Sequence, residues 1–298
     1  MTSLGAESYV THSRWTDPGE HEALLAMLPT DPTALPDVLA QWFRHPADPS
    51  APPVPAEAIG EKSIRSVAEL LGLMADRAAG NMDQALSPER CLRITCRSFS
   101  LLAVAVLRQA GVPARLRVGF ADYFTPDFLE DHWVCELHDG IRWRLFDAQM
   151  SAAWRQRLVH DIVVDDVASD RFRSAASVWQ AVRSGAVDGD RLGVSFIGIA
   201  GGWFVPGSIQ RDLAAQCKDE MLPWDYWGLG ASISDRMSIA DDEAEKVDAL
   251  AAALLHAPTI LAAARGIVDR FPWAARPPEI FSYPVDRAVT VRLDDAAA

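Results

Sequence analysis

The chain has 298 residues, of which 49% are hydrophobic and 23% are charged, a composition typical of a globular protein with a substantial core. Its formal net charge is -13. Nucleic acids and anionic membranes require dense basic surfaces, so this charge argues against both as partners. Residues 1–9 do not resemble a secretion signal and no stretch is apolar enough to span a bilayer, so we expect a cytoplasmic protein.

The four cysteines show neither a Cys-x-x-Cys spacing nor companion histidines at the intervals of a zinc site. They are Cys91, Cys96, Cys135 and Cys217. We therefore expect reduced thiols, no structural metal and no cofactor. The sequence does not indicate the oligomeric state.

Residues 1–88 are predicted to form a helical segment that packs on the rest of the chain. Apolar residues at helical spacing indicate two short helices within residues 17–45 and another over residues 64–82. Residues 44–55 are rich in proline, alanine and aspartate and are the best candidate for a linker.

A central helix is predicted after Cys96. Residues 99–107 are apolar nearly all round, which is typical of a helix buried in a core, and Gly111 and Pro113 end it. At the start of this helix, free amide groups and the positive end of the dipole favour a thiolate on Cys96. Six arginines and no acidic residue occur in residues 90–117, and their field should favour the thiolate further.

A hairpin is predicted to bring a histidine and an aspartate together. Two alternating runs, 132–138 and 141–147, flank an Asp-Gly pair that favours a two-residue turn. This register places His132 directly opposite Asp147, where the carboxylate can orient the imidazole. Residues 114–120 are predicted to add a third strand. A cysteine, a histidine and an aspartate in this order are typical of thiol acyl-transfer triads.

By strand alternation, Trp133 should point to the face opposite His132 and pack in the core. His138 lies too far along the strand to serve the same cysteine. The other histidines have no partner pattern and are expected on the solvated surface; they are His12, His21, His45, His160 and His256.

Residues 89–170 are interpreted as a catalytic core and residues 171–298 as a mostly helical extension, all in one compact unit. The extension is predicted to contain helices over 209–220, 241–256 and 258–270, with Ser208 and Ser238 in capping positions. A short strand is expected at 162–164, and an extended end after residue 272.

We also predict residues that could bind substrate or form a second pocket, which transfer of the acyl group to an amine would require. Four glycines occur in residues 198–207 and three large aromatic residues in residues 224–227, a composition that could form the dry walls of a pocket. The aromatic candidates are Trp203, Trp224, Tyr226 and Trp227. Arg97 and Gln149 lie next to predicted catalytic residues, and Arg97, Arg115 and Arg117 could meet a carboxylate or phosphate of the substrate.

The central stretch resembles the core signature of the transglutaminase-like superfamily of papain-type cysteine enzymes. The residues that carry the resemblance are 95–99 (Thr-Cys-Arg-Ser-Phe), 111–115 (Gly-Val-Pro-Ala-Arg), 131–134 (Asp-His-Trp-Val) and 146–148 (Phe-Asp-Ala). The resemblance implies an α+β fold in which a central helix with the nucleophilic cysteine packs on an antiparallel sheet. It also implies Cys96 as nucleophile, His132 as general base and Asp147 as its orienting partner.

Three functional hypotheses follow from these observations. The first is acyl transfer through an acyl-thioenzyme on a small molecule or peptide, with an amide, ester or thioester donor. The second is hydrolysis of an amide bond by a cysteine peptidase or amidase. The third is a non-catalytic binding module on a degenerate fold of the same type. Arylamine acetyltransferases use the same three residue types, but their cysteine follows an Arg-Gly-Gly sequence, whereas Ile94 and Thr95 precede Cys96.

Overall fold

The computed structural model describes residues 5–48, 51–79, 81, 84–283 and 289–293. The main sheet has six strands: β3 (Ala114–Thr125), β4 (Phe128–His138), β5 (Trp143–Phe146), β6 (Phe172–Ser174), β7 (Leu192–Val194) and β8 (Ile199–Ala200). Their order is β6-β3-β4-β7-β8, and β5 also pairs with β4. All these pairs are antiparallel except β4 with β7. The predicted α+β fold class is confirmed.

The hairpin of β3 and β4 is the longest pairing in the sheet. It runs from Ala114 opposite Leu137 to Ala121 opposite Glu130, with a register irregularity before a tight turn. In that turn Asp127 has a φ of 55°, a conformation that aspartate tolerates because its short side chain can bond locally. The strands therefore extend beyond the predicted residues 114–120 and 132–138, to include residues 121–125 and 128–131.

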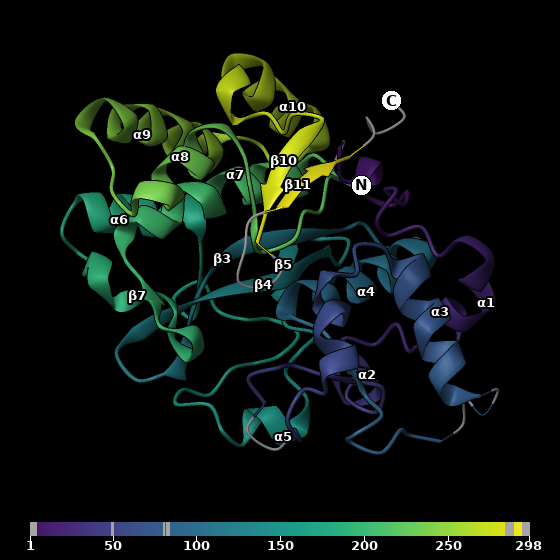
Figure 1. Cartoon of the computed structure of the whole chain (residues 1–298). Helices are drawn as coiled ribbons and strands as arrows, with labels where there is room; N and C mark the ends of the chain where they lie inside the picture. Colours follow the sequence, from purple (N-terminus) through teal and green to yellow (C-terminus); the bar gives the residue numbers. More distant parts are fainter. Residues whose placement is uncertain (1–4, 49–50, 80, 82–83, 284–288, 294–298) are drawn as a thin grey trace.

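The central helix α4 (Cys96–Gln109) confirms the predicted buried helix that begins at Cys96. Every residue from Cys96 to Arg108 is buried. The helix lies against β3 and β4, and Ser100 Oγ donates to the Trp133 carbonyl oxygen at 2.9 Å. Trp133 itself is fully buried, as predicted. Figure 1 shows α4 beside this hairpin.

The amino-terminal part packs against α4. It contains α1 (Glu22–Ala26), α2 (Leu35–Leu39) and α3 (Val67–Ala78), in agreement with the predicted helices, although Met82 lies outside the described residues. Ser66 and Glu69 form a capping box at the start of α3. Apolar residues of all three helices belong to the same hydrophobic cluster as α4, so the amino-terminal segment and the predicted core share one interior.

The proposed linker begins inside a small second sheet. Strands β1 (Phe43–Arg44) and β2 (Leu92–Arg93) are parallel neighbours. Arg44, the first residue of the predicted linker, is therefore held in a sheet. Residues 49–50 of that linker lie outside the described residues.

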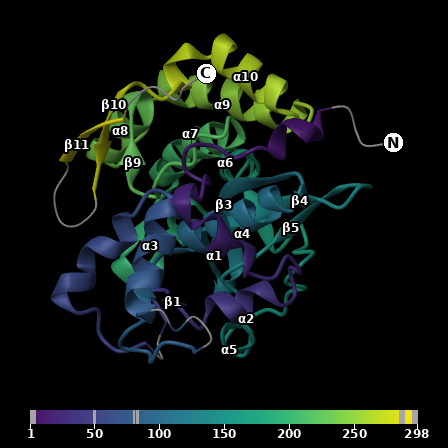
Figure 2. The ribbon, with the colours of Figure 1, turned by 90° about the vertical axis from the view of Figure 1, so that its right-hand side faces the viewer.

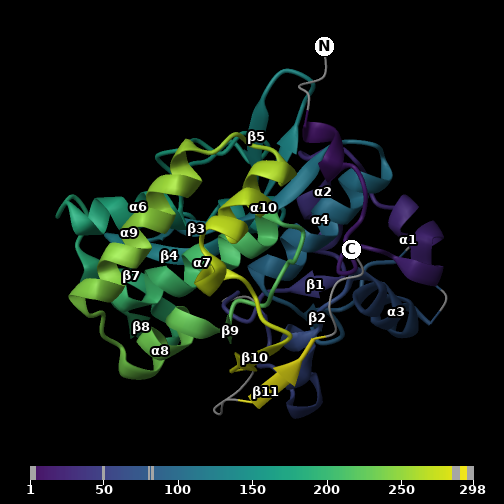
Figure 3. The ribbon, with the colours of Figure 1, turned by 90° about the horizontal axis from the view of Figure 1, so that it is seen from above.

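The carboxy-terminal half is mostly helical, as expected. Its further elements are α5 (Ala152–Arg155), α6 (Ala175–Arg183), α7 (Val205–Gln216), β9 (Asp225–Tyr226), α8 (Gly228–Arg236), α9 (Asp241–His256), α10 (Leu261–Arg270), β10 (Glu279–Ser282) and β11 (Val289–Arg292). A second hydrophobic cluster joins Phe120 of β3 to α6, α7, α9 and α10. Figures 1 and 2 show α9 and α10 on one side of the main sheet and α2 and α5 on the other. Seen from above, α7, α9 and α10 lie over β3 and β4 (Figure 3).

Three local predictions in this half are wrong. Residues 162–164 form no strand. Helix α7 begins at Val205, so Ser208 lies inside it and does not cap it, because Pro206 in the first turn already provides a favourable start. At α9, the capping residue is Ala240, whose amide donates to Glu243 Oε2 at 2.9 Å, so Ser238 is two residues too early.

Candidate active site

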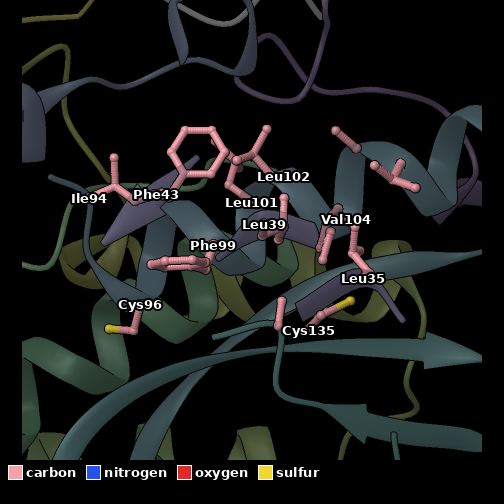
Figure 4. Close-up of a cluster of buried hydrophobic side chains, with 14 of the residues drawn as sticks. Leu35, Leu39, Phe43, Ile94, Cys96, Phe99, Leu101, Leu102, Val104 and Cys135 are labelled. Atoms are coloured by element: carbon pink, nitrogen blue, oxygen red, sulfur yellow. The ribbon is translucent and has the colours of Figure 1, made fainter. Parts of the chain in front are cut away.

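Cys96 is the first residue of α4, and its side chain is 7% exposed. Thr95 precedes it in an extended conformation and makes no side-chain capping bond. The first amide groups of a helix have no partner within the helix, so they and the positive end of the dipole face whatever approaches the sulfur. Figure 4 shows Cys96 at the end of the hydrophobic cluster, with its sulfur directed away from the other labelled side chains.

His132 and Asp147 form a buried pair. His132 Nε2 lies 2.7 Å from Asp147 Oδ2, and both side chains are almost completely buried. The second ring nitrogen of His132 does not contact Asp147, and the Cys96 thiol lies near enough to the ring to raise its pKa. The structure therefore brings the three predicted catalytic side chains together.

The pair does not form through the predicted register. Cys135 lies opposite Phe146 and His138 opposite Trp143, so the pairing is shifted by two residues and the turn is longer than the predicted Asp-Gly pair. The Asp139 carboxylate bends this turn by accepting from the amides of residues 141 and 142. A shift of two residues leaves side chains on the same face, whereas a shift of one would reverse them. His132 and Asp147 therefore still meet, although not as directly opposed residues.

Asp147 lies just beyond the end of β5 and is held by the segment that follows it. Its amide donates to the Val164 carbonyl oxygen at 2.9 Å. Its carboxylate accepts from Tyr123 Oη at 2.6 Å on the oxygen that also faces His132, and from the Gln149 amide at 3.1 Å on the other oxygen. Several donors thus fix the carboxylate in one orientation beside the imidazole.

Tyr123 was not identified from the sequence. Burial, followed by the neighbouring Asp147 carboxylate, raises the pKa of the Tyr123 hydroxyl well above its usual value, so this hydroxyl remains a donor. The signal that could have found it is its place on β3, the strand that pairs with the His132 strand. An irregular register between Ala121 and Thr125 hides that relation from simple counting.

The electrostatics of the site favour a protonated His132. Burial opposes the charged ring, but the Asp147 carboxylate and then Cys96 outweigh it and raise the pKa of His132 to about 10. An imidazolium beside the sulfur stabilises a thiolate, which is the nucleophilic form of cysteine.

Aromatic rings continue from His132 along one side of the site. Phe124 stacks edge-on against His132, with ring centroids 4.8 Å apart, and Trp154 follows at 6.1 Å from Phe124. His45 lies 6.3 Å from Trp154 and 5.9 Å from Phe196. Phe196 is 55% exposed, so this row of rings reaches the surface.

His45 corrects an expectation, because it is buried and does not lie on the solvated surface. It is 51 residues before Cys96 in the chain, and no spacing in the sequence links the two. Burial, followed by the nearby His132, lowers the pKa of His45 to about 3, so the ring is neutral.

The arginines expected to bind a substrate instead form hydrogen bonds and ion pairs with other parts of the protein. Arg97 is fully buried and donates from Nε to the Met221 carbonyl oxygen at 3.1 Å, and from its other nitrogens to the carbonyls of Glu220 and Ile64. Arg115 pairs with Glu136 at 2.6 Å. Arg117 pairs with Asp212 at 3.0 Å and also contacts Glu136. Distant acids thus neutralise arginines that have no acidic neighbour within residues 90–117.

The four aromatic residues predicted to line a pocket, Trp203, Trp224, Tyr226 and Trp227, have contacts elsewhere in the fold. Trp227 is buried and donates to the Ala274 carbonyl oxygen at 3.0 Å, and Tyr226 stacks on Arg211. Trp224 faces Lys62, and Trp203 donates to the Ala200 carbonyl oxygen. Each of these rings therefore has another partner in the fold, and none of these contacts involves Cys96, His132 or Asp147.

Three polar atoms close in the chain to Cys96 or Asp147 have no hydrogen-bond partner. In the part of the chain that the structure describes, Thr95 Oγ1, Ser98 Oγ and Gln149 Oε1 are buried without one. Buried polar atoms usually have partners, so each of these atoms marks a place where water or a substrate can bind. Gln149 thus keeps its predicted role as a substrate contact, as a prediction.

The other cysteines differ from Cys96 in their surroundings. All four are free thiols, and none of the other three contacts a histidine of the site. Burial raises the pKa of Cys91 and Cys135, and that of Cys217 to about 12.

Among the described residues there is no group of three or more potential metal ligands. No helix within the described ranges has the length and apolar character needed to cross a membrane.

Comparison with known proteins gave one family and one solved structure. Residues 76–148 match the family described as the transglutaminase-like superfamily. A candidate cysteine protease from Cytophaga hutchinsonii shares 20% sequence identity, covering 51% of this chain and 44% of that chain, with a TM-score of 0.30. No match was found among curated proteins. Residues 76–148, which contain Cys96, His132 and Asp147, are thus similar to the transglutaminase-like superfamily, whose members are typically cysteine-dependent enzymes.

Proposed function

We propose that the protein is a thiol-dependent enzyme that forms an acyl-thioenzyme on Cys96. The observation that carries this proposal is the buried His132–Asp147 pair at 2.7 Å, with the Cys96 thiol near enough to the same ring to raise its pKa. A nucleophile, a base and a group that orients the base are the three parts that activated cysteines require. The donor is an amide, ester or thioester of a small molecule or peptide.

The reaction follows from the positions of these groups. The Cys96 sulfur attacks the carbonyl carbon, and the oxyanion that forms faces the free amides at the start of α4. His132, which is protonated near neutral pH because its pKa is about 10, gives its proton to the leaving group. The bond to the leaving group breaks and leaves a thioester on Cys96. Water or an amine, deprotonated by His132, then attacks this thioester and restores the thiolate.

The acceptor decides between hydrolysis and transfer. The expected acceptor pocket rested on aromatic residues that pack elsewhere, which removes that argument for an amine. Water needs no second pocket, so hydrolysis is the first candidate. Transfer remains the second candidate because Phe124, Trp154 and the exposed Phe196 supply a different apolar wall beside His132.

Replacement of Cys96 tests the proposal. The Cys96→Ala variant should lose both labelling by iodoacetamide at neutral pH and all acyl-enzyme detected by mass spectrometry after incubation with a set of amide, ester and thioester donors. Cys91→Ala is the matched control, because Cys91 is also buried and no histidine influences its pKa. If wild type and Cys96→Ala give the same adducts, the assignment is wrong and a binding module becomes the better hypothesis.

The two acceptors can be separated with the same acyl-enzyme. Added hydroxylamine or a primary amine should divert the acyl group only if an amine can reach the thioester. A product that is entirely the free acid at high amine concentration would leave hydrolysis as the function. A predominant amide product would establish transfer.

A further inference from the structure

His45 leaves the small parallel sheet next to the start of α4. Phe43 lies opposite Leu92 and Arg44 opposite Arg93, and the Ile94 amide extends the pairing by donating to the Arg44 carbonyl oxygen at 3.1 Å. Parallel strands run in the same direction about 5 Å apart. His45 therefore emerges beside Ile94, two residues before Cys96.

The ring of His45 has a defined protonation state. Its Nδ1 accepts a hydrogen bond from the Ala47 amide at 3.1 Å. The proton of the neutral ring is therefore on Nε2, which becomes a fixed donor. Among the described residues the ring has only this hydrogen bond, so Nε2–H is available to a ligand.

His45 also belongs to the wall of the site. Its ring packs between Trp154 and Phe196, and Trp154 connects through Phe124 to His132. A charged ring at this place would be repelled by a protonated His132, whereas a neutral ring can donate a hydrogen bond without competing for the proton that His132 transfers. The geometry thus suits a donor that keeps its proton throughout the reaction.

We propose that His45 binds the substrate carbonyl, with Nε2–H donating to the oxygen of the carbonyl group that Cys96 attacks, beside the amides at the start of α4. This inference rests on the proposed function. His45 forms and breaks no covalent bond, and its proton stays on Nε2. The hydrogen bond strengthens as negative charge develops on that oxygen, which lowers the barrier to acylation.

Two reagents separate this role from others. Acylation of Cys96 by p-nitrophenyl acetate passes through an oxyanion, whereas alkylation by iodoacetamide displaces iodide from a saturated carbon and forms none. His45→Phe keeps a ring between Trp154 and Phe196 but removes the donor. We expect its acylation rate to fall by about 10²–10³-fold, the usual effect of losing one oxyanion donor, with the alkylation rate unchanged.

His45→Gln supplies a neutral N–H near the same position and should recover part of the acylation rate. It also keeps the test decisive if His45→Phe does not fold, which thermal unfolding would reveal. Equal loss of acylation and alkylation would overturn the proposal, because His45 would then act through the thiol and His132. Unchanged acylation in both folded variants would also overturn it. Failure of wild type to acylate faster than Cys96→Ala would instead refute the proposed function itself, and the role of His45 with it.

Discussion

Replacement of Asp147 by asparagine removes the charge that holds the proton on His132. The carboxylate is fully buried and faces His132 Nε2 at 2.7 Å, and asparagine has nearly the same shape. The raised pKa of His132, about 10, depends on Asp147 and Cys96 against the opposing effect of burial. Without the carboxylate we expect this pKa to fall to the ordinary value of about 6.5 or lower.

The size of the effect follows from the two pKa values. At pH 8, a ring with a pKa of about 10 is almost fully protonated, whereas one with a pKa of about 6.5 is protonated in roughly 3% of molecules. Because the protonated ring serves the leaving group, turnover of an amide at pH 8 should fall roughly 30-fold or more. The basic limb of the pH–rate profile should move from near pH 10 toward neutral pH.

Asp147→Asn should also change how the free energy of unfolding depends on pH. A histidine with a raised folded pKa stabilises the fold below its unfolded pKa of about 6.5, and this contribution is lost as the pH rises through about 10. The difference in unfolding free energy between wild type and Asp147→Asn should therefore shrink over that interval.

Turnover from pH 5 to pH 11 and urea unfolding at the same pH values measure both effects. Asp269→Asn, a change of the same chemistry at an exposed position on α10, is the control and should leave both profiles unchanged. An Asp147→Asn variant with the basic limb of wild type would refute the reasoning, because the proton on His132 would then not depend on Asp147.

Two further predictions separate support of the site from support of the fold. Tyr123→Phe removes one of the donors to Asp147 but leaves His132 in place. We therefore expect kcat to fall about tenfold while the melting temperature stays nearly unchanged. A fall in kcat as large as that of Asp147→Asn would contradict this prediction. Arg97→Met should lower the free energy of unfolding in urea by about 3–5 kcal/mol, because the buried carbonyls of Glu220 and Met221 lose their donor. A raised KM with unchanged stability would instead return Arg97 to substrate binding.

Some of the site could be predicted because it depends on local signals. The apolar run after Cys96 and the Gly111 and Pro113 that follow it specify a buried helix whatever surrounds it, and α4 begins at the predicted residue. Alternation specified the strand of His132. The prediction that His132 and Asp147 lie on the same face of the sheet was correct although the predicted register was wrong, because a shift of two residues leaves side chains on the same face.

Other parts of the site come from residues that are distant in the chain. Tyr123 reaches Asp147 across the sheet, and His45 reaches the start of α4 from another pair of strands. The segment at Val164 places Asp147, although it forms no strand. No periodicity in the sequence encodes these contacts, because each depends on which surfaces the whole fold brings together.

The charges and aromatic residues show the same division. By itself, the sequence determined a buried helix with a cysteine at its start, a histidine strand and an aspartate on the same face, because these depend on spacing along the backbone. It could not determine that Glu136 and Asp212 pair with Arg115 and Arg117, or that the aromatic rings near residue 226 pack away from the thiol. A charged or aromatic residue in a sequence can either bind a substrate or pack within the protein. Which of these it does depends on the partner that the tertiary structure places beside it.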